Sequence, residues 1–228
     1  MKYTISVFLV SALSWGASET ELDKARNRQD RPALEKIAKS AAANAAQKPK
    51  DPMAQYQSAV AHSYLSEVAL EVNDRGQARS AAEAGIPAAQ AAVALDAKRS
   101  EFHRLLGTLC GQVIPANPLT VMKYGRCAQG EVNTALSLDP KSALNWVASG
   151  VGKYYLPASF GGGADIAIKD FEKALAIDPK LPEAHLWIGL AFRKSKRTAD
   201  ARKALTRALE LNPQRLWIKQ QLEKTPAQ

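Results

Sequence analysis

The side chains able to bind a metal or transfer a proton are few in this chain and lie far apart. The three histidines are His62, His103 and His185, and the two cysteines are Cys110 and Cys127. The spacings H-x3-H, H-E-x-x-H and C-x-x-C are absent, and C-x16-C does not suit a four-ligand zinc site. We therefore predict that the protein binds no metal and no cofactor.

Nucleophilic and acid–base catalysis are not favoured either. Ser149 precedes Gly150 but lacks the first glycine of a G-x-S-x-G nucleophile elbow, and its segment has a helical pattern. The triple glycine at 161–163 has no G-x4-G-K-[ST] motif and no preceding strand, as a phosphate-binding loop would require. Carboxylates lie at expected helix starts or among other polar residues. We predict that the protein is not an enzyme.

The two cysteines allow two interpretations. Cys110 and Cys127 are 17 positions apart, and closing that loop with a disulfide would contribute roughly 3 kcal/mol to stability. Such a bond persists in an oxidising compartment. The alternative is a pair of small buried apolar side chains on facing helices. The sequence does not decide between them.

The N-terminus has the three-part pattern of a secretory signal peptide. Lys2 supplies a positive start, residues 3–15 carry no charge, and Ser14-Trp15-Gly16 places small residues before polar sequence begins. A first buried helix is the alternative, but the run is not amphipathic. We predict a cleaved signal peptide at 1–16, a periplasmic or secreted protein, and no stable membrane span after cleavage.

The chain is basic: 31 Lys and Arg against 22 Asp and Glu give a net charge of +9. Such a charge favours an acidic protein partner, an anionic membrane surface or nucleic acid. Export argues against nucleic acid, as does the near absence of aromatic residues among the basic ones. A solvated helix face is the alternative for the densest basic stretch, which is Arg193, Lys194, Lys196, Arg197, Arg202, Lys203 and Arg207.

The composition is typical of a helical protein. Of the 228 residues, 46% are hydrophobic but only 7% are aromatic, so much of the apolar content is Ala and Leu, which favour helices. The composition also excludes collagen, a disulfide-rich scaffold and a multi-span membrane protein.

A repeat organises the elements that would position any site. Four apolar runs at helical spacing end alike, at Asp96-Ala97, Asp139-Pro140, Asp178-Pro179 and Asn212-Pro213. The residue before a proline avoids the helical conformation, so we expect a helix to end at each of the Asp-Pro and Asn-Pro pairs. Upstream, His103, Trp146 and His185 each precede a glycine by four positions, which predicts that these rings pack between helices rather than bind a ligand.

This pattern resembles the tetratricopeptide repeat, W-x2-L-G-x2-Y, then A-x3-F, A and P. The last repeat supplies His185, Ile188, Gly189, Phe192, Ala201, Leu205, Ala208 and Pro213; the one before supplies Trp146, Gly150, Ala167, Phe171, Ala174 and Pro179. The resemblance implies an all-α, right-handed solenoid of antiparallel helix pairs, in which small residues let the two helices approach closely.

The repeat sets the expected domain boundaries. A degenerate leading helix pair occupies 17–52, the repeat domain 53–228, and a capping helix 214–224 covers the last repeat. Relative to the last repeat, the first three carry 11, 9 and 5 additional residues, which we place in the turn between the two helices. Two expected turn segments are 114–119, with two prolines, and 156–163, a glycine-rich elbow in which Phe160 packs into the core. The second is similar to relatives in the regulator-of-microtubule-dynamics and transporter T-component families.

The resemblance also implies a groove lined by the first helix of each pair. Its expected partner-binding residues are Tyr56, Arg104, Val147, Val151, Tyr154, Tyr155, Leu186, Leu190, Arg193 and Lys194. Tyr and Arg are frequent hot-spot residues. We predict a non-catalytic scaffold that binds a protein or peptide, with the basic charge favouring an acidic one. The alternative is a small-molecule binding component of a periplasmic uptake system.

Overall fold

The computed structural model describes residues 20–116 and 120–227, so the predicted signal peptide lies outside the described part. The described chain is helical. Its α-helices are α1 (Glu21–Asn27), α2 (Arg31–Gln47), α3 (Pro52–Glu71), α4 (Arg75–Leu95), α5 (Ser100–Ala116), α6 (Val121–Leu138), α7 (Ala143–Tyr155), α8 (Ala164–Ile177), α9 (Pro182–Lys194), α10 (Thr198–Leu211) and α11 (Leu216–Glu223), with a short 3-10 turn, η2 (Ala158–Phe160), before α8.

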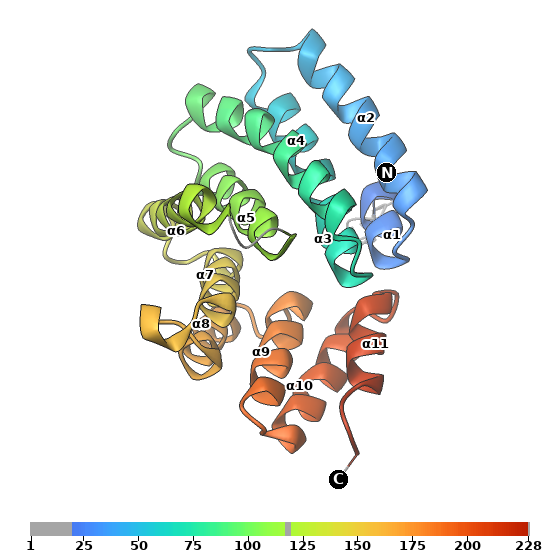
Figure 1. Ribbon diagram of the computed structural model, residues 1–228, viewed down its shortest axis with the longest axis vertical. Helices are drawn as coiled ribbons and strands as arrows, with labels where there is room; N and C mark the ends of the chain where they lie inside the picture. The colour runs from blue at the N-terminus through green and yellow to red at the C-terminus, as the bar shows by residue number, and fades with distance from the viewer. Residues whose placement is uncertain (1–19, 117–119, 228) are drawn as a thin grey trace, which may run out of the picture.

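Consecutive helices pack as antiparallel pairs, α3 with α4, α5 with α6, α7 with α8 and α9 with α10, and α11 packs on α10 as a cap. This confirms the predicted all-α solenoid. The segment expected to form a leading pair contains α1 and α2. First helices also contact one another, α3 with α5, α5 with α7 and α7 with α9, and therefore form the inner wall of the curve. Figure 1 shows an arc that brings α11 back toward α1 and α3.

The turns between pairs repeat one hydrogen-bonded arrangement. The carboxylates of Asp96, Asp139 and Asp178 each accept a hydrogen bond from the backbone N–H two residues later, at 2.9–3.2 Å. This is the turn that an Asx residue forms with its own backbone. The repeated Asp therefore helps to end each second helix and to start the next pair.

Small residues set the distance between paired helices, as the repeat pattern predicts. A Cβ added at Gly189 would lie 2.8 Å from Leu205 Cγ and 3.3 Å from the Ala201 carbonyl oxygen. One added at Gly107 would lie 3.0 Å from the Ala128 carbonyl. The predicted register between the glycine and alanine positions is thereby confirmed for both pairs.

The additional residues of the first two repeats do not form long turns, so that expectation is wrong for them. α3 and α4 have 20 and 21 residues and are separated by residues 72–74 only. α5 and α6 have 17 and 18, against 13 and 14 in α9 and α10. The sequence between the motif positions keeps helical periodicity, so the insertions add helical turns.

Among the described residues, the third repeat is the one that places its additional residues in a turn, at 156–163. Gly161 and Gly163 adopt φ of +81° and +107°, which glycine tolerates best. Phe160 is 74% exposed, so the expectation that it packs into the core is wrong. The segment 114–119 was expected to be a turn, but α5 continues through residues 114–116, with Pro115 inside the helix.

Candidate functional site

Four aromatic rings form a continuous cluster on the inner wall. Tyr154 and Tyr155 end α7, Trp187 lies on α9, and Trp217 lies on α11. Ring centroids are 5.0 Å apart for Tyr154–Tyr155, 5.8 Å for Tyr154–Trp187, 6.1 Å for Tyr155–Trp187 and 5.6 Å for Trp187–Trp217. All four contacts are edge-on, the geometry that aromatic quadrupoles favour. We call these four residues the aromatic cluster.

Tyr155 is the most accessible ring of the cluster, with 57% of its surface exposed. Desolvation nonetheless raises the pKa of its hydroxyl to about 12, with further increases from Tyr154, Glu67 and Glu71. Glu67 and Glu71 belong to α3, so the Tyr155 hydroxyl lies within electrostatic range of a helix from the N-terminal half of the arc. At neutral pH its hydroxyl is a hydrogen-bonding group and not an anion.

Lys194 and Arg193, at the end of α9, are already engaged within the chain. Lys194 Nζ donates to the Tyr154 carbonyl oxygen at 2.6 Å and lies 4.3 Å from the centre of the Tyr154 ring. Arg193 donates to Gln221 and Thr225, including a 2.7 Å bond to Gln221 Oε1. Lys194 thus ties α9 to α7, and Arg193 ties α9 to the cap.

The other predicted groove residues divide by burial. Val147, Leu186 and Leu190 are at most 7% exposed, and the last two lie in one core cluster with Ile218 of α11. A partner would reach Leu186 and Leu190 only if α11 moved. Val151 is partly buried against the neighbouring core.

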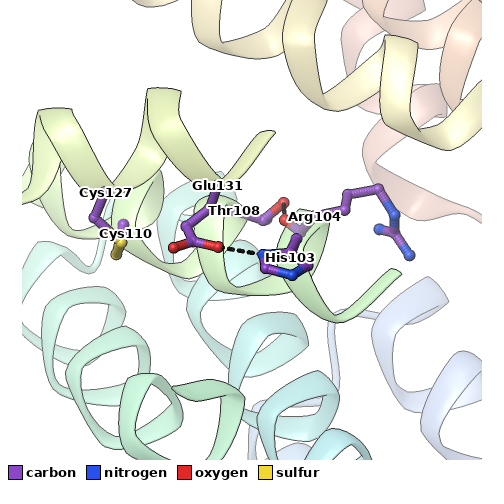
Figure 2. The surroundings of a disulfide bond; sticks show 6 residues. All are labelled: His103, Arg104, Thr108, Cys110, Cys127 and Glu131. Atoms are coloured by element: carbon purple, nitrogen blue, oxygen red, sulfur yellow. Dashed lines mark hydrogen bonds and ion pairs between the residues drawn. A yellow bond between two sulfur atoms is a disulfide. The ribbon is translucent and has the colours of Figure 1, made fainter. Parts of the chain in front are cut away.

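Tyr56 and Arg104 lie in the N-terminal half of the wall. Tyr56 stacks at 5.0 Å on Phe102 of α5. Arg104 is partly exposed, and its guanidinium forms no ion pair within the described residues. Figure 2 shows its side chain extending away from the α5–α6 pair. The structure therefore leaves Tyr155 and Arg104 as the predicted groove residues most available to a partner.

Cys110 and Cys127 are joined in a disulfide that connects α5 to α6, with their Cα atoms 6.0 Å apart (Figure 2). Along the same pair of helices, His103 Nδ1 lies 2.6 Å from Glu131 Oε2. Both contacts join α5 to α6. The disulfide also means that neither cysteine is a free thiol.

His103 and His185 have the packing role predicted from their place in the repeat. Nε2 of each lies at hydrogen-bond distance from the carbonyl oxygen six residues earlier, 3.0 Å to Ala97 and 2.9 Å to Pro179. Trp146 Nε1 donates to the Pro140 carbonyl in the same way, at 2.8 Å. In these three repeats, a ring nitrogen of the first helix therefore contacts the turn that precedes it.

The two ends of the chain meet through a charged network, which we call the seam. Arg26 of α1 contacts Glu67 of α3 at 2.8 Å and Glu183 of α9 at 3.1 Å. Arg215, just before α11, contacts Glu67 at 3.2 Å and also pairs with Glu71. The side chains of Arg215 and Glu71 are each 2% exposed. Four sequence-distant segments therefore share one set of ion pairs.

The two glutamates of the seam respond differently to burial. For Glu67, burial raises the pKa, but attraction by Arg26 and Arg215 outweighs it and leaves the pKa below its usual value. For Glu71, burial raises the pKa to about 7, and repulsion by Glu67 adds to it against the attraction of Arg215. The desolvation of Glu71 thus exceeds what its single arginine returns.

Sequence reasoning did not identify Trp187, Trp217 or the seam residues as parts of a site. Trp187 occupies the sixth position of a first helix, which faces the groove in this repeat, and that position could have indicated it. The seam gives no comparable signal, because its members are separated by up to 189 positions and belong to no motif.

Within residues 20–116 and 120–227, no group of three or more His, Cys, Asp or Glu side chains is arranged to hold a metal ion. In the same range, no helix combines the length and the apolar character needed to cross a membrane.

Comparison with known proteins supports this architecture. Residues 165–196 match a TPR repeat model and residues 182–215 match a tetratricopeptide repeat model. Among solved structures, TTC0263, described as a thermophilic TPR protein in Thermus thermophilus, superposes with a TM-score of 0.61 at 18% identity, covering 90% of this chain and 98% of that one. The HusA haemophore from Porphyromonas gingivalis gives 0.59 at 20% identity, covering 78% and 96%. A search of curated protein sequences gives no significant match.

The fold therefore defines a solenoid of helix pairs of the repeat-protein class. More particularly, residues 165–215 match tetratricopeptide repeats, and the described chain has the fold of a solved TPR protein. Such a fold generally serves as a non-catalytic scaffold for protein–protein interaction.

Proposed function

We propose that this protein is an exported scaffold that binds a protein or peptide partner on its inner wall. The observation that carries the proposal is the aromatic cluster, because Tyr155 presents an exposed ring that packs against Tyr154 and Trp187. Rings that are held in place by neighbours lose little side-chain entropy on binding, and Tyr and Trp are enriched among hot-spot residues.

The partner that suits this wall carries an apolar or aromatic residue next to an acidic one. The ring face of Tyr155 would take the apolar group, and the guanidinium of Arg104 would pair with the carboxylate. The net charge of +9 supports the same choice, because long-range attraction steers an acidic segment toward a basic protein.

Affinity capture tests the binding role and offers a matched control on the same stretch of chain. The processed protein, Tyr155→Ala and Phe160→Ala would each be used to capture partners from an extract of exported proteins. Phe160 is exposed, but it forms no ring contact with the aromatic cluster. We expect Tyr155→Ala to lower the affinity for the captured partner by about 30-fold, which corresponds to the ~2 kcal/mol of a hot spot. Phe160→Ala should bind the partner with unchanged affinity. Equal binding by all three proteins would contradict the proposal.

Export is a separate part of the proposal. It is supported by the signal-like pattern of residues 1–16 and by the compatibility of the Cys110–Cys127 disulfide with an oxidising compartment. N-terminal sequencing of the processed protein should begin at Ala17 or Ser18. An intact Met1 in a cytoplasmic fraction would contradict it.

A second candidate function is the binding of a flat aromatic ligand of an uptake system. The edge-on arrangement of the four rings favours it, and HusA, which shares the fold, is described as a haemophore. Titration with haem, followed by absorbance, separates the two functions. A saturating spectral change that Tyr155→Ala abolishes supports the ligand, whereas its absence together with capture of a protein supports the scaffold.

A further inference from the structure

The seam differs from the apolar contact that joins α7–α8 to α9. There, one apolar cluster links Val147 of α7, Phe171 of α8 and Ile188 of α9. At the seam, the cluster on the side of α1–α4 and the cluster on the side of α9–α11 have no member in common. Within the described residues, the two ends are therefore held by polar groups.

The polar contacts across the seam are numerous but not close-packed. Besides the ion pairs, the Gln29 and Gln220 amides bond each other at 3.1 and 3.3 Å, and Arg215 Nη1 donates to the Arg26 carbonyl at 3.0 Å. Arg215 Nε is buried and has no hydrogen-bond partner among the described residues. A pocket of about 360 Å³ lies at the same place, lined by Asp23 and Tyr64 from one end and by Asn212 and Gln214 from the other.

These features predict a small free-energy difference between a closed and an open seam. Burying charges costs solvation that their mutual attraction returns only in part, and a buried ion network is weak evidence for net stability. When the ends separate, Arg215 and Glu71 regain water, and neither of the two described apolar clusters beside the seam is divided. Opening also leaves the helix pairs themselves intact.

We propose that Arg215 and its two glutamates form a reversible latch that closes the solenoid into a ring and releases it into an open arc. The latch adjoins the aromatic cluster: the Arg215 guanidinium lies 5.9 Å from the Trp217 ring centre, and Glu67 and Glu71 lie within electrostatic range of Tyr155. Closure therefore restricts lateral access to that wall. This consequence rests on the proposed binding function, whereas the latch itself does not.

Spin labels at the two ends test the latch without any partner. The labels would be attached to cysteines introduced by Arg28→Cys, between α1 and α2, and by Lys219→Cys, in α11. Both positions are exposed. The native cysteines do not compete because they are joined in the disulfide. Double electron–electron resonance then measures the distance between the ends at low and high salt.

We expect one short distance at low salt and an additional, longer one at high salt, because salt stabilises the rehydrated charges of the open form. Arg215→Gln should shift the distribution toward the longer distance by about tenfold in population ratio. The double variant Glu67→Gln/Glu71→Gln tests the same latch from α3, where disturbing the start of α11 is not a concern. Arg207→Gln, which removes an exposed pair with Glu210 on α10, is the matched control and should leave the distribution unchanged.

An unchanged distance distribution in both seam variants, at both salt concentrations, would overturn the latch. Local melting of α11 in Arg215→Gln would show as lost helix by circular dichroism, and the α3 double variant would then decide. Affinity for a captured partner is measured separately. A latch that opens without changing that affinity would contradict the gating of the wall and leave the latch and the binding function standing.

Discussion

The N-terminal and C-terminal halves of the solenoid use the same helix pairing with different helix lengths. The four helices α7–α10 have 13 or 14 residues, whereas α3 and α4 have 20 and 21. At 1.5 Å per residue, α3 is roughly 30 Å long and α9 roughly 20 Å. The additional turns at the end of α3 carry Glu67 and Glu71 to Arg215. The repeat motif therefore builds the arc, and the added helix length closes it.

The two halves also differ in what holds their boundaries. In the regular half, buried Ala and Gly allow close apolar packing, as at Ala167, Ala174 and Gly189. At the boundary that the lengthened helix reaches, charges replace apolar contacts. The stability of a charged boundary depends on pH and salt, whereas the stability of an apolar boundary depends on the volumes of its side chains.

The largest expected effect is a pH dependence carried by Glu71. The pKa of this carboxyl is about 7 in the folded chain, against a usual value of 4.5. Between these values the folded protein holds a proton that the unfolded chain releases, so the free energy of unfolding falls as the pH rises from 4.5 to 7. At about 1.4 kcal/mol per pKa unit, the fall is at most about 3 kcal/mol. Urea unfolding at several pH values measures it.

Glu71→Gln should remove this slope, because the amide does not titrate. Glu67 contributes with the opposite sign and in a lower window: its pKa is depressed, so its contribution is lost as the pH falls below its usual range. Of the cations that face these carboxylates, Arg215 contacts both and Arg26 contacts Glu67. A slope between pH 4.5 and 7 that is equal in wild type and Glu71→Gln would refute the assignment.

The next largest expected effect concerns the disulfide between α5 and α6, in the half of the chain that has the longer helices. Replacing both Cys110 and Cys127 with Ala removes a disulfide that closes a 17-residue separation, which should cost roughly 3 kcal/mol. For a chain of this size that corresponds to roughly 6–12 °C in Tm. Thermal melts of the oxidised wild type, the reduced wild type and the double variant would check it. A melting temperature unaffected by reduction would show that the long α5–α6 pair does not depend on the bond.

In the regular half, two glycines of α7 should respond in opposite directions. A Cβ at Gly150 would lie 2.4 Å from the Phe171 ring, whereas one at Gly152 would meet nothing within 4 Å. Gly150→Ala should therefore cost about 1–3 kcal/mol through overpacking. Gly152→Ala should stabilise by about 0.5–1 kcal/mol, because alanine favours the helix. Each variant is the control for the other in denaturant unfolding, and a shift of the same sign in both would contradict the packing.

The repeat architecture could be predicted from the sequence because it depends on local signals. Asp-Pro pairs end helices through backbone sterics, and the glycine and alanine positions report how closely two helices approach. The close approach of Gly189 to Ala201 follows from these signals alone. The positions of His103 and His185 beside an upstream carbonyl follow from their alignment with Trp146.

The seam and the lengthened helices could not be predicted in the same way. An insertion between two motifs can extend a helix or form a loop, and both are compatible with a fixed number of residues. Phe160 shows the same limit, because an aromatic residue beside three glycines suits a buried elbow or an exposed turn. The contacts of Arg215 depend on where the arc returns, which is a property of the summed curvature of the repeats.

The smallest expected effect concerns the close approach of α3 and α4. In this pair the small residue lies on the second helix, whereas in later pairs the glycine lies on the first helix. His62 stands on α3 where later repeats have glycine, and Gly85 stands on α4 where they have alanine. A Cβ at Gly85 would lie 2.8 Å from His62 Cβ, so the two helices meet with the small residue on the opposite partner. Gly85→Ala should thus destabilise the chain despite its better helix propensity, by about 1 kcal/mol net.

A double-mutant cycle isolates this contact. His62→Gly alone should cost about 1 kcal/mol or more, because glycine weakens a helix interior and the imidazole contacts are lost. In the double variant the methyl group introduced by Gly85→Ala occupies the space left by His62, so the combined cost should be smaller than the sum by about 1 kcal/mol. The same cycle with Gly130→Ala, whose added Cβ would meet nothing within 4 Å, should be additive with His62→Gly. Additivity in the His62–Gly85 cycle would mean that the first pair is spaced by its other contacts, and that the small-residue rule of the regular half does not extend to it.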